Sequence, residues 1–167
     1  ERTGGIIEPL PKLQWFIDVN KPIKKRDGKT LKELMREPVA NKEISIIPNY
    51  FDKTYFHWID NLKDWCISRQ IWYGHQIPVW YQPGAKEELY VGLEAPTEGT
   101  WTQDQDTLDT WFSASLWTFS TLGWPEETED LKIYHPTSVL ETGPDILFFW
   151  VARMILMSEY HLGTIPF

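Results

Sequence analysis

The most constraining feature of this sequence is a long apolar segment in its last third. Residues 146–157, ILFFWVARMILM, are interrupted by a single charge, Arg153, so a helix here would be apolar on nearly every face, the pattern of a helix buried on several sides. A short strand-like run at 138–140 and the Gly143-Pro144 turn precede it. Strand, tight turn and buried helix form a unit of an α/β sheet, in which ligands bind beyond the carboxyl ends of the strands. The sequence therefore predicts an α/β ligand-binding fold with a helix from Ile146 to about Tyr160.

Composition and charge exclude several classes of protein. The chain has 16 Lys and Arg against 24 Asp and Glu, and this net charge of −8 argues against an autonomous nucleic-acid-binding protein without excluding local basic contacts. Cys66 is the only cysteine, so we expect neither a disulfide framework nor a cysteine-rich zinc site. No signal-peptide pattern opens the chain, and the apolar segment is shorter than the ~20 residues that span a bilayer. We therefore expect a cytoplasmic protein without membrane association.

Local patterns predict further elements before the apolar segment. Thr30 and Glu33 form the signature of a capping box for a helix that begins at Leu31. Apolar residues recur every three or four positions after Asp52, which is placed to cap a second helix. Turn residues separate short runs between residues 78 and 101, as in an irregular β-hairpin. The other predicted elements are strands at 13–19 and 43–47, a buried helix at 110–121 ended by Gly123, and a short helix that starts at Pro125.

Carboxylates at two places are candidates for chemistry. Asp145 precedes the apolar helix, where it could cap the helix or bind the ammonium group of a ligand. Asp106 and Asp109 are three residues apart and could bind a metal ion, but no third hard ligand lies nearby, which favours capping. Both readings of Asp145 remain open on the residues alone.

A third candidate is the segment 66–78, CISRQIWYGHQIP, in which polar donors alternate with aromatic rings. Such a mixture suits stacking on bases and binding to phosphates, and it equally suits a packed helix end with one exposed arginine. Its candidate residues are Ser68, Arg69, Gln70, Trp72, Tyr73, His75 and Gln76. The basic cluster Lys24, Lys25, Arg26 and Lys29 is interpreted as a solvated face, with a phosphate-backbone contact as the alternative, and His57, His135 and His161 as structural or surface residues.

Three blocks in this order resemble a known family. They are DWCISRQIWYGHQIPVWY at 64–81, DTLDTWFSASLWTFSTLGWPEETEDLK at 106–132 and TGPDILFFWVARM at 142–154. Together they resemble the class I aminoacyl-tRNA synthetases of the isoleucine/leucine/valine group, and the last two blocks point to the valyl-tRNA synthetases. The resemblance extends to EPLPKLQWF and KTYFHWIDNLKDW, and so covers nearly the whole chain.

The resemblance implies an α/β fold, namely a partial Rossmann-like catalytic domain with an inserted irregular β-hairpin. It implies a fragment, because neither a HIGH-type nor a KMSKS-type ATP-binding sequence occurs. The implied parts are 1–50, a segment returning from the editing insertion; 51–81, a helix and the SRQ block; 82–103, a hairpin without zinc ligands; and 104–167, a second-half Rossmann-like segment. Many members of the family carry cysteine pairs in the hairpin, and this chain has none.

The resemblance also implies site residues. Trp111 and Ile146 match residues that form the valine side-chain pocket of the family, and Asp145 and Trp150 would line the same cavity. Pro144 stands where the family usually has a bulky residue, which could stiffen the loop or alter one wall of the site. Ser68, Arg69, Gln70, Trp72 and His75 would face the catalytic cleft or the tRNA acceptor end.

The implied activity is that of the full-length enzyme, which joins valine to tRNA(Val) with ATP and Mg²⁺. No zinc is expected in this chain, and its partners would be valine, the acceptor end of tRNA(Val) and the remainder of the same enzyme. We expect no adenylation by the chain alone. Two alternatives stay open: a free-standing, non-catalytic module derived from a synthetase, and isoleucyl or leucyl specificity.

Overall fold

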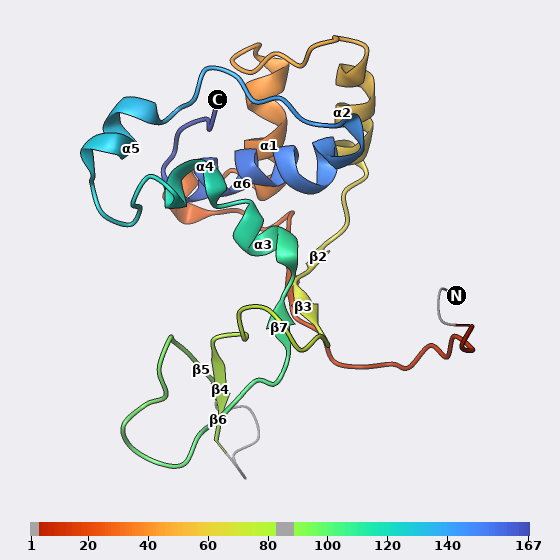
Figure 1. The fold of residues 1–167 in the computed structure, drawn as a ribbon, viewed down its shortest axis with the longest axis vertical. Coiled ribbons are helices and arrows are strands. Elements are labelled where there is room, and N and C mark those ends of the chain that lie inside the picture. The colour runs from red at the N-terminus through yellow and green to blue at the C-terminus, as the bar shows by residue number, and fades with distance from the viewer. Residues whose placement is uncertain (1–3, 83–88) are drawn as a thin grey trace.

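Three helices form the main body of the computed structural model, which describes residues 4–82 and 89–167. They are α1 (Leu31–Ala40), α2 (Phe51–Asp60) and α6 (Ala152–His161). Figure 1 shows α1 and α6 crossing at the centre of this body, with α2 beside them. Their facing side chains are fully buried, because each helix directs an apolar stripe at the others. The largest of these buried side chains are Tyr55, Met35, Ile59, Met154 and Ile155.

The start of α1 is built as its sequence predicts. The Thr30 hydroxyl accepts a hydrogen bond from the Glu33 backbone N–H, and the Glu33 carboxylate accepts one from the Thr30 N–H at 2.8 Å. The prediction of a strand at 43–47 is wrong: this stretch is a loop. The N–H groups of Glu43 and Ile44 both bond the Pro38 carbonyl at the end of α1, so they are not available to a neighbouring strand.

The α2 helix is confirmed, although Asp52 does not cap it. The helix starts at Phe51, and its first residue is preceded by Tyr50 without a side-chain cap. Asp52 lies inside the first turn and pairs with Lys42 at 2.8 Å instead.

The helix predicted over 110–121 is present as two short pieces, α3 (Thr110–Ala114) and α4 (Trp117–Ser120). Ser115 lies between them, fully buried, and its hydroxyl donates to the Phe112 carbonyl at 2.8 Å. Such local back-bonding by a serine competes with continuous helical bonding.

Gly123 follows α4 with a φ of +99°, a conformation that favours glycine. The next helix, α5 (Glu129–Tyr134), starts later than predicted because Thr128 caps it by accepting from the Leu131 N–H.

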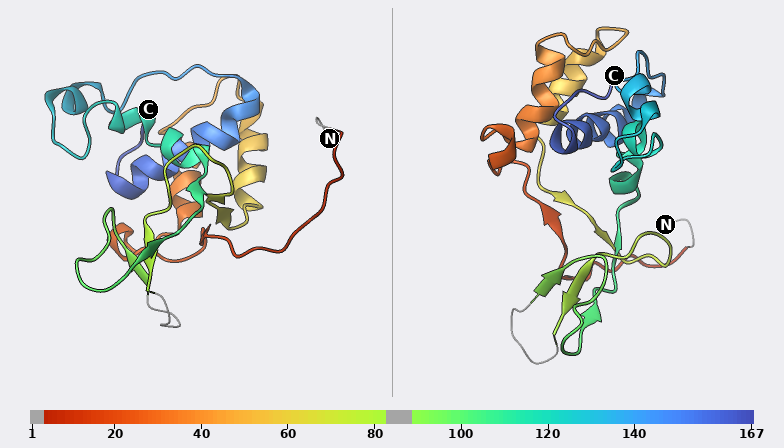
Figure 2. Two further views of the ribbon diagram at one scale, coloured as in Figure 1. Left: turned by 60° about the horizontal axis from the view of Figure 1, so that its bottom comes forward. Right: turned by 90° about the vertical axis from the view of Figure 1, so that its left-hand side faces the viewer.

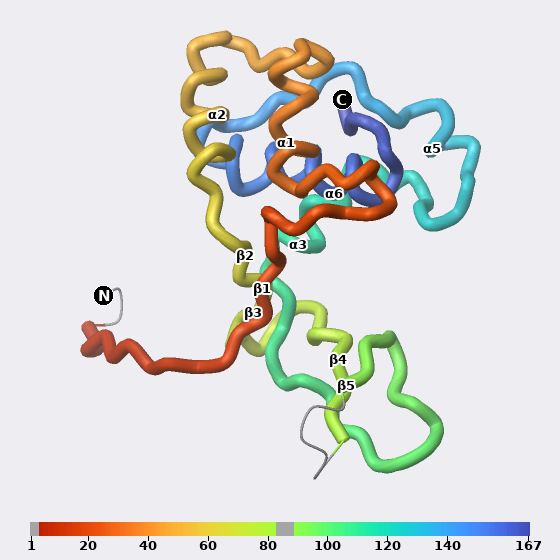
Figure 3. Tube along the Cα trace, turned by 180° about the vertical axis from the view of Figure 1, so that it is seen from behind, coloured from red at the N-terminus to blue at the C-terminus, as the bar shows by residue number. Residues whose placement is uncertain are grey.

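Short antiparallel ladders connect the helical body to a separate sheet. Strand β1 (Phe16–Ile17) pairs with β2 (Trp65–Cys66), and β3 (Ser68–Arg69) pairs with β7 (Thr107–Leu108). Figures 2 and 3 show these two ladders as a neck below the helices. Beyond the neck, β4 (Val79–Tyr81) lies between β5 (Leu89–Val91) and β6 (Thr102–Gln103), so the predicted hairpin is a three-stranded sheet.

The segment before the apolar helix differs from its prediction. Residues 138–140 are irregular and are not paired as a strand, and Val139 is 79% exposed. A β-strand forms only when a neighbouring strand accepts and donates its backbone hydrogen bonds. None of the paired strands among the described residues includes 138–140. Asp145 does not cap the helix, because Gly143 occupies the cap position and Asp145 lies in the first turn with no side-chain cap bond. Among the described residues, no helix has the length and apolar character needed to cross a membrane.

The helix itself begins in an unusual way. A 3-10 turn (Pro144–Ile146) leads into a π-helical turn (Leu147–Val151), and only then does α6 follow. Single π-helical turns inside α-helices are rare overall, and those that occur are often found at functional sites. Here the π turn determines how three consecutive aromatic side chains are directed.

Candidate functional site

An aromatic cluster forms where α3 meets the π turn. The rings of Trp111 and Phe149 are stacked, with centroids 5.9 Å apart and planes inclined by 29°. The Trp150 indole N–H donates to the Ala114 carbonyl at 3.0 Å, and its ring lies 5.9 Å from that of Trp117. The structure therefore brings Trp111 and Trp150 together on facing elements that are far apart in sequence. Both side chains are half-buried, so each keeps a surface for a ligand.

The other two residues predicted for the same pocket lie in the 3-10 turn. Ile146 is half-buried and immediately precedes the π turn. Asp145 is exposed, so its carboxylate is accessible to a ligand. Pro144 is the first residue of this turn, where its fixed φ suits the start of a helical turn.

A buried carboxylate, that of Asp109, lies immediately before α3, the helix that carries Trp111. Asp109 is 5% exposed, accepts a hydrogen bond from the Trp65 indole N–H at 2.9 Å, and pairs with Arg69 at 3.3 Å. The Arg153 guanidinium lies 4.4 Å from the centre of the Trp65 ring. Burial lowers the pKa of Arg153 to about 10, an effect that the Asp109 charge opposes and the Arg69 charge reinforces. Asp109 thus pairs with Arg69, and its charge also acts on Arg153.

Asp106 and Asp109 have different partners in the structure. Asp109 precedes α3, but its side chain makes no cap hydrogen bond. Asp106 pairs with Lys12 at 2.8 Å and accepts from the Gln70 amide at 2.7 Å. The capping interpretation therefore holds only for the position of Asp109, which is the N-cap residue of α3, and not for Asp106. Within residues 4–82 and 89–167, no three His, Cys, Asp or Glu side chains gather as metal ligands would.

The SRQ residues form internal cross-links of the neck. Ser68 is 2% exposed; its hydroxyl accepts from the Trp15 N–H at 2.8 Å and donates to the Gln14 side chain at 2.7 Å. Arg69 bonds the carbonyls of Cys66 and Ser68 in addition to its pair with Asp109. The Gln70 amide is similarly bonded to Asp106 and Gln14. These side chains hold the backbone of the block in place.

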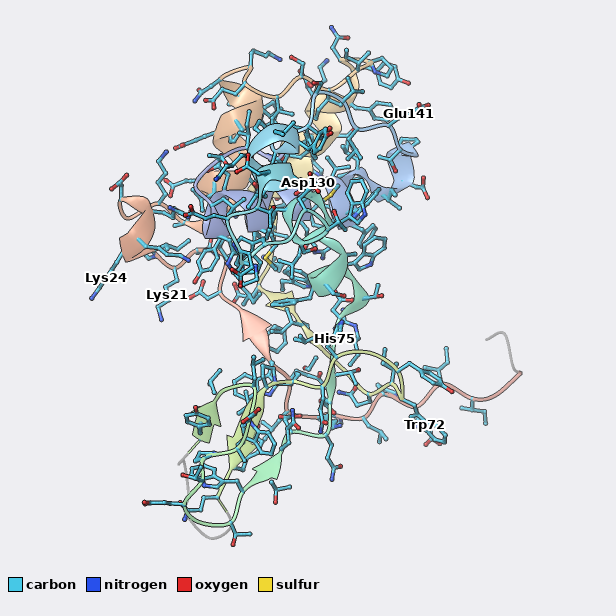
Figure 4. All side chains as sticks on the ribbon, turned by 60° about the vertical axis from the view of Figure 1, so that its left-hand side comes forward. Lys21, Lys24, Trp72, His75, Asp130 and Glu141 are labelled. Carbon is cyan, nitrogen blue, oxygen red and sulfur yellow. The ribbon has the colours of Figure 1, made fainter. Side chains whose placement is uncertain are left out.

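The following loop is different, because its side chains project into solvent. Trp72 is 95% exposed and Tyr73 is 86% exposed, and His75 is exposed as well. Figure 4 shows Trp72 at the end of this loop and His75 near the neck. The structure thus separates the predicted set into two groups. Ser68, Arg69 and Gln70 are hydrogen-bonded connectors, of which Ser68 is buried, Arg69 half-buried and Gln70 exposed, whereas Trp72 and His75 project into solvent.

A cavity of about 400 Å³ lies beside the neck, between the end of α2, the start of β2 and the π turn. Its walls include Trp58, Trp65, Phe148, Arg69 and Arg153. None of the four predicted pocket residues lines it. It is a separate hollow on the α2 side of the π turn.

The basic cluster near the N-terminus packs partly against α6. Arg26 donates from Nη2 to the Tyr160 carbonyl at 2.8 Å, and Lys25 Nζ lies 3.7 Å from the centre of the Tyr160 ring. Lys29 pairs with Glu37. Lys24 projects away from the body in Figure 4, as the interpretation of a solvated face predicts.

Comparison with known proteins decides the family. The model of the class I tRNA synthetases for isoleucine, leucine, methionine and valine matches residues 7–95 and 85–167. This chain belongs to the class I tRNA synthetases. The mixed helices and small sheets are consistent with a partial α/β domain of such a synthetase.

Several relatives of this class I synthetase chain are valine–tRNA ligases. The chain is 53% identical to that of Protochlamydia amoebophila over 99% of its own length and 17% of the relative. It is 49% identical to that of Bacillus subtilis over 100% of its length and 18% of the relative. The chain therefore spans less than a fifth of the length of these relatives.

Sequence reasoning missed two side chains beside this aromatic cluster, Phe149 and Arg153. Phe149 stacks on Trp111, and Arg153 links the π turn to Trp65 and lies near Asp109. A signal for Arg153 was present, since it is the one charge in the apolar segment 146–157. Phe149 had no such signal, because it is one of several large apolar residues in a row.

Proposed function

We propose that this chain is part of a valine–tRNA ligase and supplies one wall of its valine pocket. The observation that carries the proposal is the meeting of Trp111 on α3 with Phe149 and Trp150 on the π turn, which leaves aromatic surface half-exposed. The names of the relatives, which are 46–53% identical over the whole chain, support the choice of valine. In this proposal Trp111, Ile146 and Trp150 are the apolar wall.

The chemistry of the substrate agrees with such a wall. Valine has a small, branched, apolar side chain, and it is best bound by an apolar slot with few polar groups. The exposed carboxylate of Asp145 borders this wall, where it can accept a hydrogen bond from the ammonium group of an amino acid. An apolar slot separates substrates that differ by one methylene by only about 1–3 kcal/mol. We therefore expect these residues to set selectivity among similar amino acids.

The activation of valine with ATP needs groups that this chain does not display. The printed sequence has no glycine-rich phosphate loop, and the described residues gather no set of metal ligands. The HIGH-type and KMSKS-type sequences of the family are also absent from the sequence, so we assign no contact with ATP or Mg²⁺ to these residues and expect no valine-dependent ATP–pyrophosphate exchange by the isolated chain. Adenylation would depend on the remainder of the enzyme, which we expect to act in the cytoplasm.

We further propose that the loop after the SRQ block faces the tRNA acceptor end. Trp72 and Tyr73 offer exposed rings on which unpaired bases can stack, a contact worth about 1–3 kcal/mol per base. His75 is exposed beside them. Ser68, Arg69 and Gln70 would serve this role indirectly, by fixing the backbone from which the loop projects.

The pocket is tested by substitution in the intact enzyme. We expect Trp111→Ala and Ile146→Ala to reduce the preference for valine over isoleucine in ATP–pyrophosphate exchange by roughly 10-fold or more, the size of a one-methylene selectivity. Trp101→Ala is the matched control, since Trp101 lies beside the three-stranded sheet and bonds the Glu98 carbonyl. Unchanged selectivity in both pocket variants would show that the pocket assignment is wrong. A preference for isoleucine in the unmodified enzyme would show a sister specificity.

A further inference from the structure

We propose that Phe149, held in place by Arg153, is a positioning residue that sets the orientation of Trp111 in the amino-acid pocket. The inference rests on the proposed function, because it assigns a role within that pocket. It concerns two residues to which neither the sequence motifs nor the relatives give a role.

The π turn directs its aromatic side chains to different neighbours. Phe148 turns toward α2, where its ring lies 5.5 Å from that of Trp58. Phe149 turns toward α3 and stacks on Trp111. The next residue, Trp150, bonds the carbonyl of Ala114 at the end of α3. Of these three aromatic side chains, Phe149 is therefore the one whose ring stacks on Trp111, a residue of the proposed pocket wall.

Arg153 fixes the residue that carries this ring. Its Nη1 donates to the Phe149 carbonyl at 2.8 Å, and its guanidinium lies 5.6 Å from the centre of the Phe149 ring. The same guanidinium lies 4.4 Å from the centre of the Trp65 ring, so a second aromatic contact also holds it. A planar guanidinium can make the hydrogen bond and the ring contacts together, which a lysine ammonium cannot do in the same geometry.

Trp111 needs such external support. It lies on α3, a helix of five residues without a side-chain cap, and so short a helix has little stability of its own. Phe149 is 46% exposed, so its ring is not held by burial and depends on its attachment to the π turn. Loss of the Phe149 ring would free the indole of Trp111 to adopt other rotamers, and the pocket would then fit valine less closely.

The test compares two adjacent phenylalanines in the intact enzyme. We expect Phe149→Leu to raise the KM for valine and to lower the selectivity for valine over isoleucine by about two- to tenfold, the contribution of one aromatic pair. The kcat for valine should change little, because the lost interaction acts in ground state and transition state alike. Phe148→Leu removes a ring that packs on Trp58 and also lies beside Phe149 and Arg153, but it keeps the stack on Trp111, so it should change selectivity much less than Phe149→Leu does. Phe149→Tyr keeps the stack and should restore the parent values.

The outcomes separate this inference from the proposed function. If Trp111→Ala changes selectivity while Phe149→Leu and Phe148→Leu behave alike, the positioning role is wrong and the pocket stands. If Trp111→Ala leaves selectivity unchanged, the proposed pocket fails and this inference fails with it. If Phe149→Leu does not fold, the valine-over-isoleucine selectivities of Phe149→Tyr and Arg153→Lys are measured instead. A selectivity of Arg153→Lys equal to that of the parent enzyme would overturn the role of the arginine.

Discussion

His135 is a half-buried histidine, and its charge state is expected to affect the stability of the fold. Its Nε2 lies 3.1 Å from the hydroxyl of Ser158, a fully buried residue of α6. Burial lowers the pKa of His135 below its ordinary value of 6.5, so the ring is neutral in the folded chain at neutral pH. As the pH falls below about 6.5, the unfolded chain binds a proton before the folded chain does. The free energy of unfolding should therefore decrease until the pH passes below the folded-state pKa.

This dependence is measured by urea unfolding at about pH 7.5 and about pH 5.5, on either side of the ordinary histidine pKa. We expect His135→Gln to reduce the difference between the two pH values. His161 has a pKa lowered by burial and by Lys25 and Arg26, so part of the difference should remain. The control is His57→Gln, since His57 is exposed on α2. An equal pH difference in both variants would refute the role of His135.

The carboxylates at 106 and 109 show which residue properties are readable from sequence. Their types and spacing were evident, but their partners were not, because Lys12, Trp65 and Arg69 are distant along the chain. The two acids flank β7, a strand, and residues three apart in a strand point to opposite faces. The metal-binding alternative considered for this pair would need both carboxylates to reach one ion. Candidate site residues could therefore be named from the family resemblance, but the contacts around them required the tertiary structure.

At the scale of elements, α1 depends on its capping box. Thr30→Ala removes the acceptor for the Glu33 N–H and should lower the free energy of unfolding by about 0.5–2 kcal/mol. Thr30→Ser keeps the hydroxyl and should cost much less. Both values come from urea unfolding followed by tryptophan fluorescence. Because α1 packs on α6 through buried side chains, equal stability of Thr30→Ala and the parent chain would mean that packing alone holds the first turn.

Helices were more predictable than strands for a physical reason. The pattern of α1 and α2 is local, because the hydrogen bonds of a helix join residues four apart. A strand is defined by a partner, and the runs at 43–47 and 138–140 have strand-like composition without such a partner in the described part of the chain. The break between α3 and α4 was equally hidden, since it depends on the hydroxyl of Ser115.

At the scale of the whole molecule, the sheet of β4, β5 and β6 should be stable without metal. Its ladders are supplemented by the Trp80 indole N–H, which donates to the Gly92 carbonyl at 2.9 Å, and by the bond from Trp101 to Glu98. We expect elemental analysis of the purified enzyme to show no zinc bound through this chain, and EDTA to leave the Tm of the isolated chain unchanged. Stoichiometric zinc in the isolated chain, with a lower Tm after EDTA, would contradict this expectation.

The neck has a consequence for how such chains diverge. The backbone leaves the helical body along β3 and returns along β7, its antiparallel neighbour, so the two ends of residues 70–106 are side by side. Segments whose ends lie close together tolerate insertion and deletion well. The length, sequence and metal content of residues 70–106 can therefore change during evolution, while the pairing of β3 with β7 preserves the point at which this segment is attached. Recombination at these two strands would exchange the whole segment between related enzymes and leave the packing of the helical body unaltered.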